Sequence, residues 1–176
     1  MIAAKDNPPK TDIGDAGQAI QTTKLLTPSH NQVPSAAKWL GTIGGIPFVL
    51  LALLSTILDV SLQEWAHFAL AAYGAVILSF LGGIHWGLAI ATANPGQSNG
   101  STFVRLSISV IPSLVGWCAL LISGPLGLTL MASAFIGLLL FDWYASQKAQ
   151  VPAWYLKLRW PLTAAVVVSL TFAVFA

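Results

Sequence analysis

The sequence predicts an all-α integral membrane protein: a bundle of five transmembrane helices with its N-terminus in the cytoplasm. Three observations predict this class. The 176 residues are 56% hydrophobic and only 8% charged, with a mean hydropathy of +0.75, whereas roughly 25% of residues in soluble domains are charged. Five apolar stretches approach the roughly 20 helical residues that cross a bilayer core. The positive charges gather on one side of the resulting topology.

A polar stretch precedes the predicted crossings. Residues 1–38 are rich in Pro, Gln, Thr and Asp, a composition that cannot bury a core, so we expect a disordered cytoplasmic tail. Residues 39–176 form the predicted transmembrane domain. Its apolar segments are residues 39–58, 65–92, 105–122, 126–145 and 161–176. These crossings leave no room for a soluble catalytic domain after residue 38.

The distribution of cations sets the predicted orientation. With the N-terminus inside, the outer face carries only two charged residues, Asp59 and Glu64. Cytoplasmic loops of membrane proteins carry an excess of Lys and Arg. The residues that fall inside are Lys5, Lys10, Lys24, Lys38, Arg105, Lys148, Lys157 and Arg159. Membrane topology thus accounts for the basic residues, and we expect a lipid bilayer and no nucleic acid as the partner.

The first two segments carry packing signals. Gly41 and Gly45 allow close helix approach, and Pro47 predicts a kink. The second segment, at 28 residues or roughly 42 Å, must tilt or protrude. Small residues recur along it every four positions, which predicts a packing ridge and a central place in the bundle. The members of this ridge are Ala71, Ala75, Ser79, Gly83, Gly87 and Ala91.

Turn residues and a stretch typical of the membrane interface set the predicted limits of the remaining segments. Residues 94–101 predict a cytoplasmic loop, and the break at residues 123–125 predicts an antiparallel hairpin of the third and fourth segments. Residues 152–160 mix aromatic rings with cations, which is typical of a short helix in the headgroup plane. The fifth segment, residues 161–176, is then so short that it barely spans.

Four ionisable groups from different segments share the inner part of the membrane. His85 lies nine residues before Asn94, roughly 14 Å along the helix, and Arg105, Asp142 and Arg159 lie near the same boundary. Such groups are unfavourable in lipid unless they are paired or line a wet cavity, so they form a candidate binding site. An alternative is that they only snorkel and anchor the bundle. The full candidate ligand-binding set is His85, Trp86, Arg105, Asp142, Trp154, Tyr155 and Arg159.

Several chemistries find no support in the sequence. A haem held by two histidines of one chain is disfavoured, because His67 and His85 lie on one helix about 27 Å apart. The spacing of His, Cys and carboxylate residues matches no metal site. No nucleophile motif surrounds Ser79, the serine on the helix of His85. We therefore assign no catalytic residue and no metal ligand, leave the cofactor unknown, and favour a protein that is not an enzyme.

Residues 73–87, which contain the string Ser-Phe-Leu-Gly-Gly-Ile-His-Trp-Gly, resemble the signature of a membrane family of unknown function, the one to which transmembrane protein 69 belongs. Further matches follow in order over about residues 39–176. They are residues 45–48, Pro112 with Trp117, Asp142, residues 152–155, Leu158-Arg159 and Leu162-Thr163. The resemblance implies a small helical protein of bacterial inner membranes, with eukaryotic relatives in mitochondria. It implies no catalytic or ligand role for any residue.

Three functional hypotheses remain. The leading one is a non-enzymatic accessory or assembly subunit in an energy-transducing membrane, bound to other membrane subunits. It depends on the short loops and on a second segment with two interaction faces. The alternative is a binding protein for an amphiphilic small molecule, a quinone, haem or lipid, in an inner-leaflet pocket near His85 and Asp142. The third is a proton or small-solute conduit with His85 as its relay. For all three we expect a multi-pass protein of a bacterial inner membrane.

Overall fold

The computed structural model describes residues 33–92, 99–148 and 151–176, and all regular structure in these ranges is α-helical. Each helix is long and apolar enough to cross a membrane. The helices are α2 (Ser35–Ile57), α3 (Val60–Ala91), α4 (Asn99–Ile122), α5 (Gly124–Gln147) and α6 (Ala153–Phe175). The predicted fold class is confirmed, and the chain is a multi-pass membrane protein.

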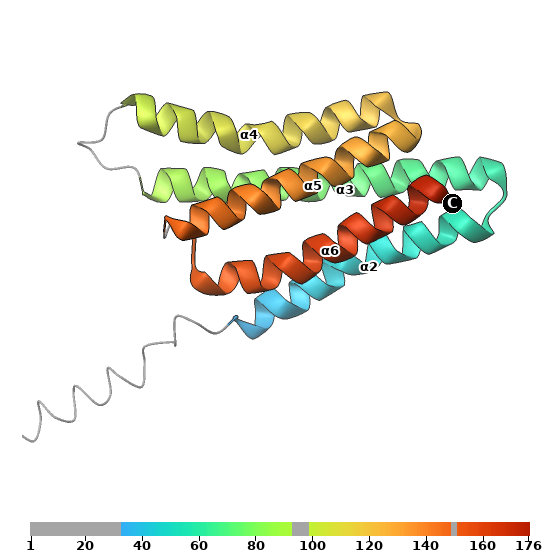
Figure 1. Cartoon of the computed structure of the whole chain (residues 1–176), viewed down its shortest axis with the longest axis horizontal. Helices are drawn as coiled ribbons and strands as arrows, with labels where there is room; N and C mark the ends of the chain where they lie inside the picture. The colour runs from blue at the N-terminus through green and yellow to red at the C-terminus, as the bar shows by residue number, and fades with distance from the viewer. Residues whose placement is uncertain (1–32, 93–98, 149–150) are drawn as a thin grey trace, which may run out of the picture. The chain divides into compact units, whose positions relative to one another are not determined.

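Successive helices run in opposite directions, so α2, α4 and α6 begin at the same end of the bundle, where α3 and α5 finish (Figure 1). Neighbours in sequence pack together, and α6 closes the ring against α2. A further contact joins α3 to α5 across the ring. Both α3 and α5 therefore touch three other helices, so the central position predicted for the second segment is shared with α5.

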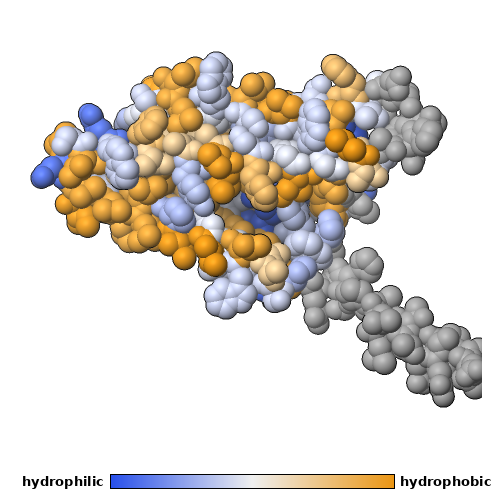
Figure 2. Space-filling view, turned by 180° about the vertical axis from the view of Figure 1, so that it is seen from behind, coloured by the Kyte–Doolittle hydropathy of each residue, from blue (hydrophilic) through white to orange (hydrophobic). Residues whose placement is uncertain are grey.

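The outward faces of the helices are apolar, as lipid requires. Large hydrophobic side chains such as Trp39, Phe80 and Phe175 are mostly exposed, and hydrophobic surface covers much of the bundle in Figure 2. A soluble monomer rarely exposes apolar patches beyond a few hundred Å². The interior is a continuous apolar core, whose largest fully buried members include Phe48, Leu70, Leu78, Met131, Phe135 and Leu170.

The helix limits correct several sequence-based expectations. The first helix begins at Ser35 and the third at Asn99, so both extend beyond their predicted starts. The predicted tail over residues 1–38 overlaps the described chain only from residue 33, and most of it lies outside the described residues. The loop predicted for residues 94–101 likewise lies mainly outside them.

The headgroup-plane helix expected over residues 152–160 is wrong. Those residues form the first two turns of α6, which continues through Pro161 to Phe175. The reason is that Tyr155 and Arg159 are 8% and 5% exposed and face the interior of the bundle. At 23 residues, or about 35 Å, α6 is long enough to span a bilayer fully. The expectation that the fifth segment barely spans is therefore also wrong.

The prediction that small residues of α3 form a packing ridge is correct only for the first half of the helix. Ala71 and Ala75 are buried, and a Cβ added to Gly116 of α4 would lie 3.1 Å from the Ala75 Cα. Gly83 and Gly87 instead have open space where a Cβ would stand. Each four-residue step turns the ridge by about 40°, so it leaves the helix interface. The close approach in the second half of α3 is made by Gly82.

The predicted hairpin between the third and fourth segments is present, as α4 and α5. Its turn places Ser123 and Gly124 in the left-handed region, with φ values of 50° and 59°. Just inside α5, Gly127 packs against the Ala119 carbonyl oxygen. This contact lets the two helices meet without a longer loop.

Gly82 and Gly83 form a matched pair for testing this packing. A Cβ at Gly82 would overlap the Ser109 carbonyl oxygen of α4, whereas one at Gly83 meets nothing within 4 Å. Both replacements remove a helix-destabilising glycine, so only the contact differs. We expect Gly82→Ala to lower the unfolding temperature in detergent, with an overpacking cost of about 1–3 kcal/mol, and Gly83→Ala to leave it equal or higher. Equal shifts would contradict the helix contact.

Candidate functional site

The carboxylate of Asp142 joins three helices near the end of the bundle where α2, α4 and α6 begin. It is fully buried, and its two oxygens have separate partners. Oδ1 lies 2.6 Å from Nε2 of His85 on α3, and Oδ2 accepts a hydrogen bond of 2.8 Å from Nε of Arg159 on α6. Three of the four ionisable groups predicted to share a depth thus form one network.

Local packing holds both partners of Asp142 in place. The preceding residue on α5, Phe141, meets the His85 ring edge-on, with centroids 4.9 Å apart and an interplanar angle of 71°. The imidazole donates to Oδ1 when its proton is on Nε2, which the neutral ring allows. The guanidinium of Arg159 comes from the second turn of α6 and is 6% exposed. A paired charge of this kind is how a membrane interior tolerates ionised groups.

A cleft of about 460 Å³ opens between α2, α3 and α6, with Phe135 of α5 also lining it. Its wall is mostly apolar, and on the α2 side Gly41, Gly44 and Gly45 contribute no side chain. A Cβ at Gly45 would meet nothing within 4 Å. Figure 2 shows a hollow in the hydrophobic face of the bundle, with hydrophilic surface at its floor. The cleft is thus a pocket with an apolar wall and a small polar part.

The polar part of the cleft comes from one stripe of α6. Tyr155, Arg159 and Thr163 are spaced every four residues, so they share a helix face, and all three line the cleft. Their exposed fractions are 8%, 5% and 2%. The Tyr155 hydroxyl, Nη2 of Arg159 and the Thr163 hydroxyl are buried, and no hydrogen-bond partner among the described residues reaches them.

These unpaired atoms are energetically significant. A buried donor or acceptor without a partner costs about 1–3 kcal/mol, and a bilayer core holds no bulk water to supply one. Most buried polar groups in native proteins are paired. Three unpaired groups on one wall of one cleft therefore indicate partners outside this chain, either ordered water or a bound molecule.

The remaining candidate residues lie at varying distances from this cleft. Trp154 lines it and meets Tyr155 edge-on, with ring centroids 6.3 Å apart. Trp86 is 42% exposed on the bundle surface and is not among the residues that line the cleft. Arg105 does not join the Asp142 network; its Nη1 donates to the Thr92 hydroxyl at 2.9 Å.

The sequence-based pocket flanked by His85 and Asp142 differs from what the structure contains. His85 lines a separate groove of about 260 Å³ between α3, α4 and α5, and a cavity of about 50 Å³ that it shares with Arg105. Arg159 lines the α2/α3/α6 cleft. Asp142 bonds to both His85 and Arg159. Its carboxylate thus links a residue of the α3/α4/α5 groove to a residue of the α2/α3/α6 cleft.

Sequence reasoning missed Thr163 and the glycines as parts of a cleft. The four-residue spacing from Tyr155 through Arg159 to Thr163 is a signal that could have found the threonine, had the helix not been broken at Pro161 in the prediction. The glycines were interpreted as contact points. That is correct for Gly41, where a Cβ would come within 2.9 Å of Leu162, and incorrect for Gly45.

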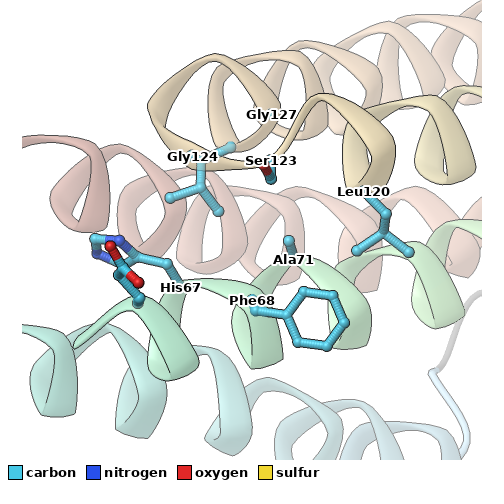
Figure 3. Close-up of a pocket in the computed structure, with 9 residues that line it drawn as sticks. His67, Phe68, Ala71, Leu120, Ser123, Gly124 and Gly127 are labelled. Carbon is cyan, nitrogen blue, oxygen red and sulfur yellow. The ribbon is translucent and has the colours of Figure 1, made fainter. Parts of the chain in front are cut away.

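A further cavity of about 370 Å³ lies at the opposite end of the bundle, where α3 faces the α4–α5 turn. Figure 3 shows His67, Phe68 and Ala71 on one side of it and Ser123, Gly124 and Gly127 on the other. Nε2 of His67 is buried and has no partner among the described residues. The exposed Glu64 completes the polar lining. Across the described ranges, no group of three or more His, Cys, Asp or Glu side chains could hold a metal ion.

Comparison with known proteins agrees with the resemblance seen in the sequence. Residues 33–175 match the family described as "Protein of unknown function (DUF3429)". The chain belongs to this family. Every helix and both cavities that Asp142 links lie within the matched region of this DUF3429 protein.

Two relatives are named Transmembrane protein 69. The one from Xenopus tropicalis is 44% identical over 88 residues, which are 50% of this chain and 33% of the relative. The one from Mus musculus is 36% identical over 90 residues, 51% of this chain and 35% of the relative. The matched part thus spans about a third of each relative's length. No solved structure matches this DUF3429 protein.

A double-mutant cycle tests the Asp142 network. Removing one partner of a buried ion pair is expected to cost about 3–5 kcal/mol, whereas replacing both by apolar residues is often close to neutral. We therefore expect Asp142→Leu and Arg159→Met each to lower the unfolding temperature in detergent strongly, and the double variant to recover most of the loss. Lys157→Met, at an exposed position on the same helix, serves as the control. Additive losses in the double variant would argue against a direct pair.

Proposed function

We propose that this protein binds an amphiphilic small molecule in the α2/α3/α6 cleft. The observation that carries the proposal is the set of three buried, unpaired polar atoms along one stripe of α6 within an otherwise apolar cleft. Ligand sites combine a mainly apolar wall with a few polar groups that fix orientation, and they measure about 300–1,000 Å³. The cleft has both features. An apolar tail would lie against α2, and a polar end would meet α6.

The Asp142 network supports this site indirectly. The bond from Asp142 fixes Nε of Arg159, a residue that lines the cleft, while its buried Nη2 has no partner among the described residues. A guanidinium held in this way presents a donor in a defined direction. His85 and Asp142 then act as positioning residues behind the pocket, and the ligand contacts come from Tyr155, Arg159 and Thr163.

The leading sequence-based hypothesis, an accessory or assembly subunit bound to other membrane subunits, stays a prediction. The apolar outer face of the bundle suits a protein partner and lipid equally well, so no described contact favours it over the cleft. The conduit hypothesis gains no support. The two hydroxyls toward the outer end of α3 are already bonded to backbone carbonyls, Ser79 to Ala75 and Tyr73 to Gly44.

The proposal includes a bacterial inner membrane and a cytoplasmic N-terminus. In support, the cations of the described chain, among them Lys38, Arg105 and Lys148, lie at the end where α2, α4 and α6 begin. Asp59 and Glu64 lie at the other end. The named relatives are vertebrate proteins and lend no support to a bacterial compartment, whereas the orientation has its own test.

Fusions to the C-terminus test this orientation. Because α6 runs outward from the cytoplasmic end, we expect alkaline phosphatase fused after Ala176 to be active in bacterial cells and a green fluorescent protein fused there to be dark. A fusion after Lys148 should show the opposite pattern. A bright fluorescent C-terminal fusion would contradict the proposed orientation.

A cleft-filling substitution tests ligand binding itself. Gly45 lines the cleft with open space at its Cβ position, so Gly45→Leu should occupy the site without a clash. Gly87→Leu on α3 is the matched control, because Gly87 also has open space and is not among the cleft-lining residues. We expect native mass spectrometry of gently purified wild type and Gly87→Leu to detect a retained amphiphile, and Gly45→Leu to lose at least tenfold of it. Equal retention in all three proteins, or none in wild type, would contradict the proposal.

A further inference from the structure

The three unpaired atoms of the cleft restrict the chemistry of its ligand. Nη2 of Arg159 can only donate a hydrogen bond, and the hydroxyls of Tyr155 and Thr163 can donate as well as accept. A ligand that satisfies Nη2 of Arg159 must therefore present an acceptor oxygen or nitrogen, and each hydroxyl can pair with a further acceptor or with a donor. Side chains four residues apart on a helix are separated by a rise of about 6 Å. A ligand that bonds to all three groups must therefore present polar atoms at more than one point along the stripe.

The charge balance of the site favours an uncharged ligand. The Arg159 guanidinium already has a counter-charge, because Asp142 lies 2.8 Å from its Nε. The other carboxylate oxygen lies 2.6 Å from Nε2 of His85. The Arg159–Asp142 ion pair itself carries no net charge. An anionic headgroup would add an uncompensated charge to a mostly apolar cleft, which is strongly unfavourable in a membrane interior.

The walls favour a flat ring with an apolar tail. Phe48, Phe80 and Trp154 line the cleft, and the glycines of α2 contribute no side chain beside them. Aromatic side chains pair with a planar ring by stacked or edge-on contacts. A haem fits less well. The cleft-lining residues include no His, Cys or Met to ligate its iron, and His85 faces another groove.

From these observations we infer that the ligand class is a lipophilic quinone: a neutral ring that carries carbonyl acceptors on opposite edges and an apolar tail. This inference rests on the proposed function and specifies its ligand. The carbonyl groups accept hydrogen bonds from Tyr155, Arg159 and Thr163, and the tail lies along the glycine-lined side of α2. No redox step is assigned to the site.

The test uses the full-length protein in lipid nanodiscs at neutral pH with three probes of similar tail length. Decylubiquinone is neutral and carries carbonyl acceptors, dodecanoate is anionic, and decylbenzene has a ring without acceptors. Saturable binding is followed by tryptophan fluorescence and by the shift of the unfolding temperature. Gly45→Leu is titrated in parallel to subtract partitioning into lipid. We expect decylubiquinone to bind at least tenfold more tightly than either other probe.

Tyr155→Phe and Thr163→Val provide the sharper readout. Each is expected to maintain or raise the stability of the unliganded protein and to lower its affinity for the quinone. Each removes a buried hydroxyl that lacks a partner, so the variant without ligand should unfold at an equal or higher temperature than wild type. Each also removes one hydrogen bond to the quinone, so its affinity should fall about fivefold. A purely structural role for these hydroxyls would destabilise the unliganded protein instead, and that result would overturn the inference.

The outcomes separate this inference from the proposed function. If dodecanoate binds as tightly as decylubiquinone or more tightly, the cleft is an amphiphile site and the quinone class is wrong. The same holds if Tyr155→Phe and Thr163→Val leave quinone affinity unchanged. If no probe binds saturably and wild type retains no amphiphile on gentle purification, both the quinone inference and the proposed function are wrong.

Discussion

The half of the bundle where α2, α4 and α6 begin depends on one carboxylate. Asp142 on α5 receives hydrogen bonds from His85 on α3 and Arg159 on α6, at 2.6 and 2.8 Å. In a low-dielectric interior these groups are tolerable only as a network, since any one of them left alone would be an uncompensated buried charge or dipole. The network therefore fixes the rotation of three helices at once. It also sets the orientation of the Arg159 guanidinium, which lines the cleft.

Glycine placement complements this polar constraint. Gly82 and Gly127 bring helix backbones into contact, which suits lipid, where dispersion and close packing replace the hydrophobic driving force between helices. Gly45 has the opposite effect, because nothing fills the space beside it. The same residue type thus closes the α3–α4 and α4–α5 contacts and opens the α2 side of the cleft. Which effect a glycine has depends on the rotation of its helix, and the Asp142 network helps to set that rotation.

The sequence predicted the fold well for a physical reason. A chain that must satisfy its backbone hydrogen bonds within lipid can only form helices of spanning length or a closed barrel, so hydropathy alone identifies five crossings. The limits were less predictable. Pro161 was taken as a helix start, but α6 passes through it, because the burial of Tyr155 and Arg159 holds the two preceding turns against the bundle. The ridge on α3 was extended too far because a four-residue period drifts around a helix.

The sequence predicted which ionisable residues could meet at the site, but not how their side chains and the cavities around them are arranged. A common depth correctly suggested that His85, Asp142 and Arg159 could meet, since depth follows from position along a spanning helix. The sequence could not say that Arg105 would bond to Thr92 or that Trp86 would face outward, because those outcomes depend on helix rotation. Nor could it separate the two cavities on either side of Asp142. The unpaired Thr163 hydroxyl required the packed structure to be recognised.

We infer that a molecule outside the chain satisfies the polar stripe of α6. An experimental structure of the protein, extracted from its native membrane with its lipids retained, tests this inference. We expect non-protein density within hydrogen-bonding distance of Arg159 Nη2 and the Tyr155 hydroxyl, extending along Gly45 of α2. A structure in which α2 closes against α6, with those atoms bonded to other residues of the chain, would contradict it.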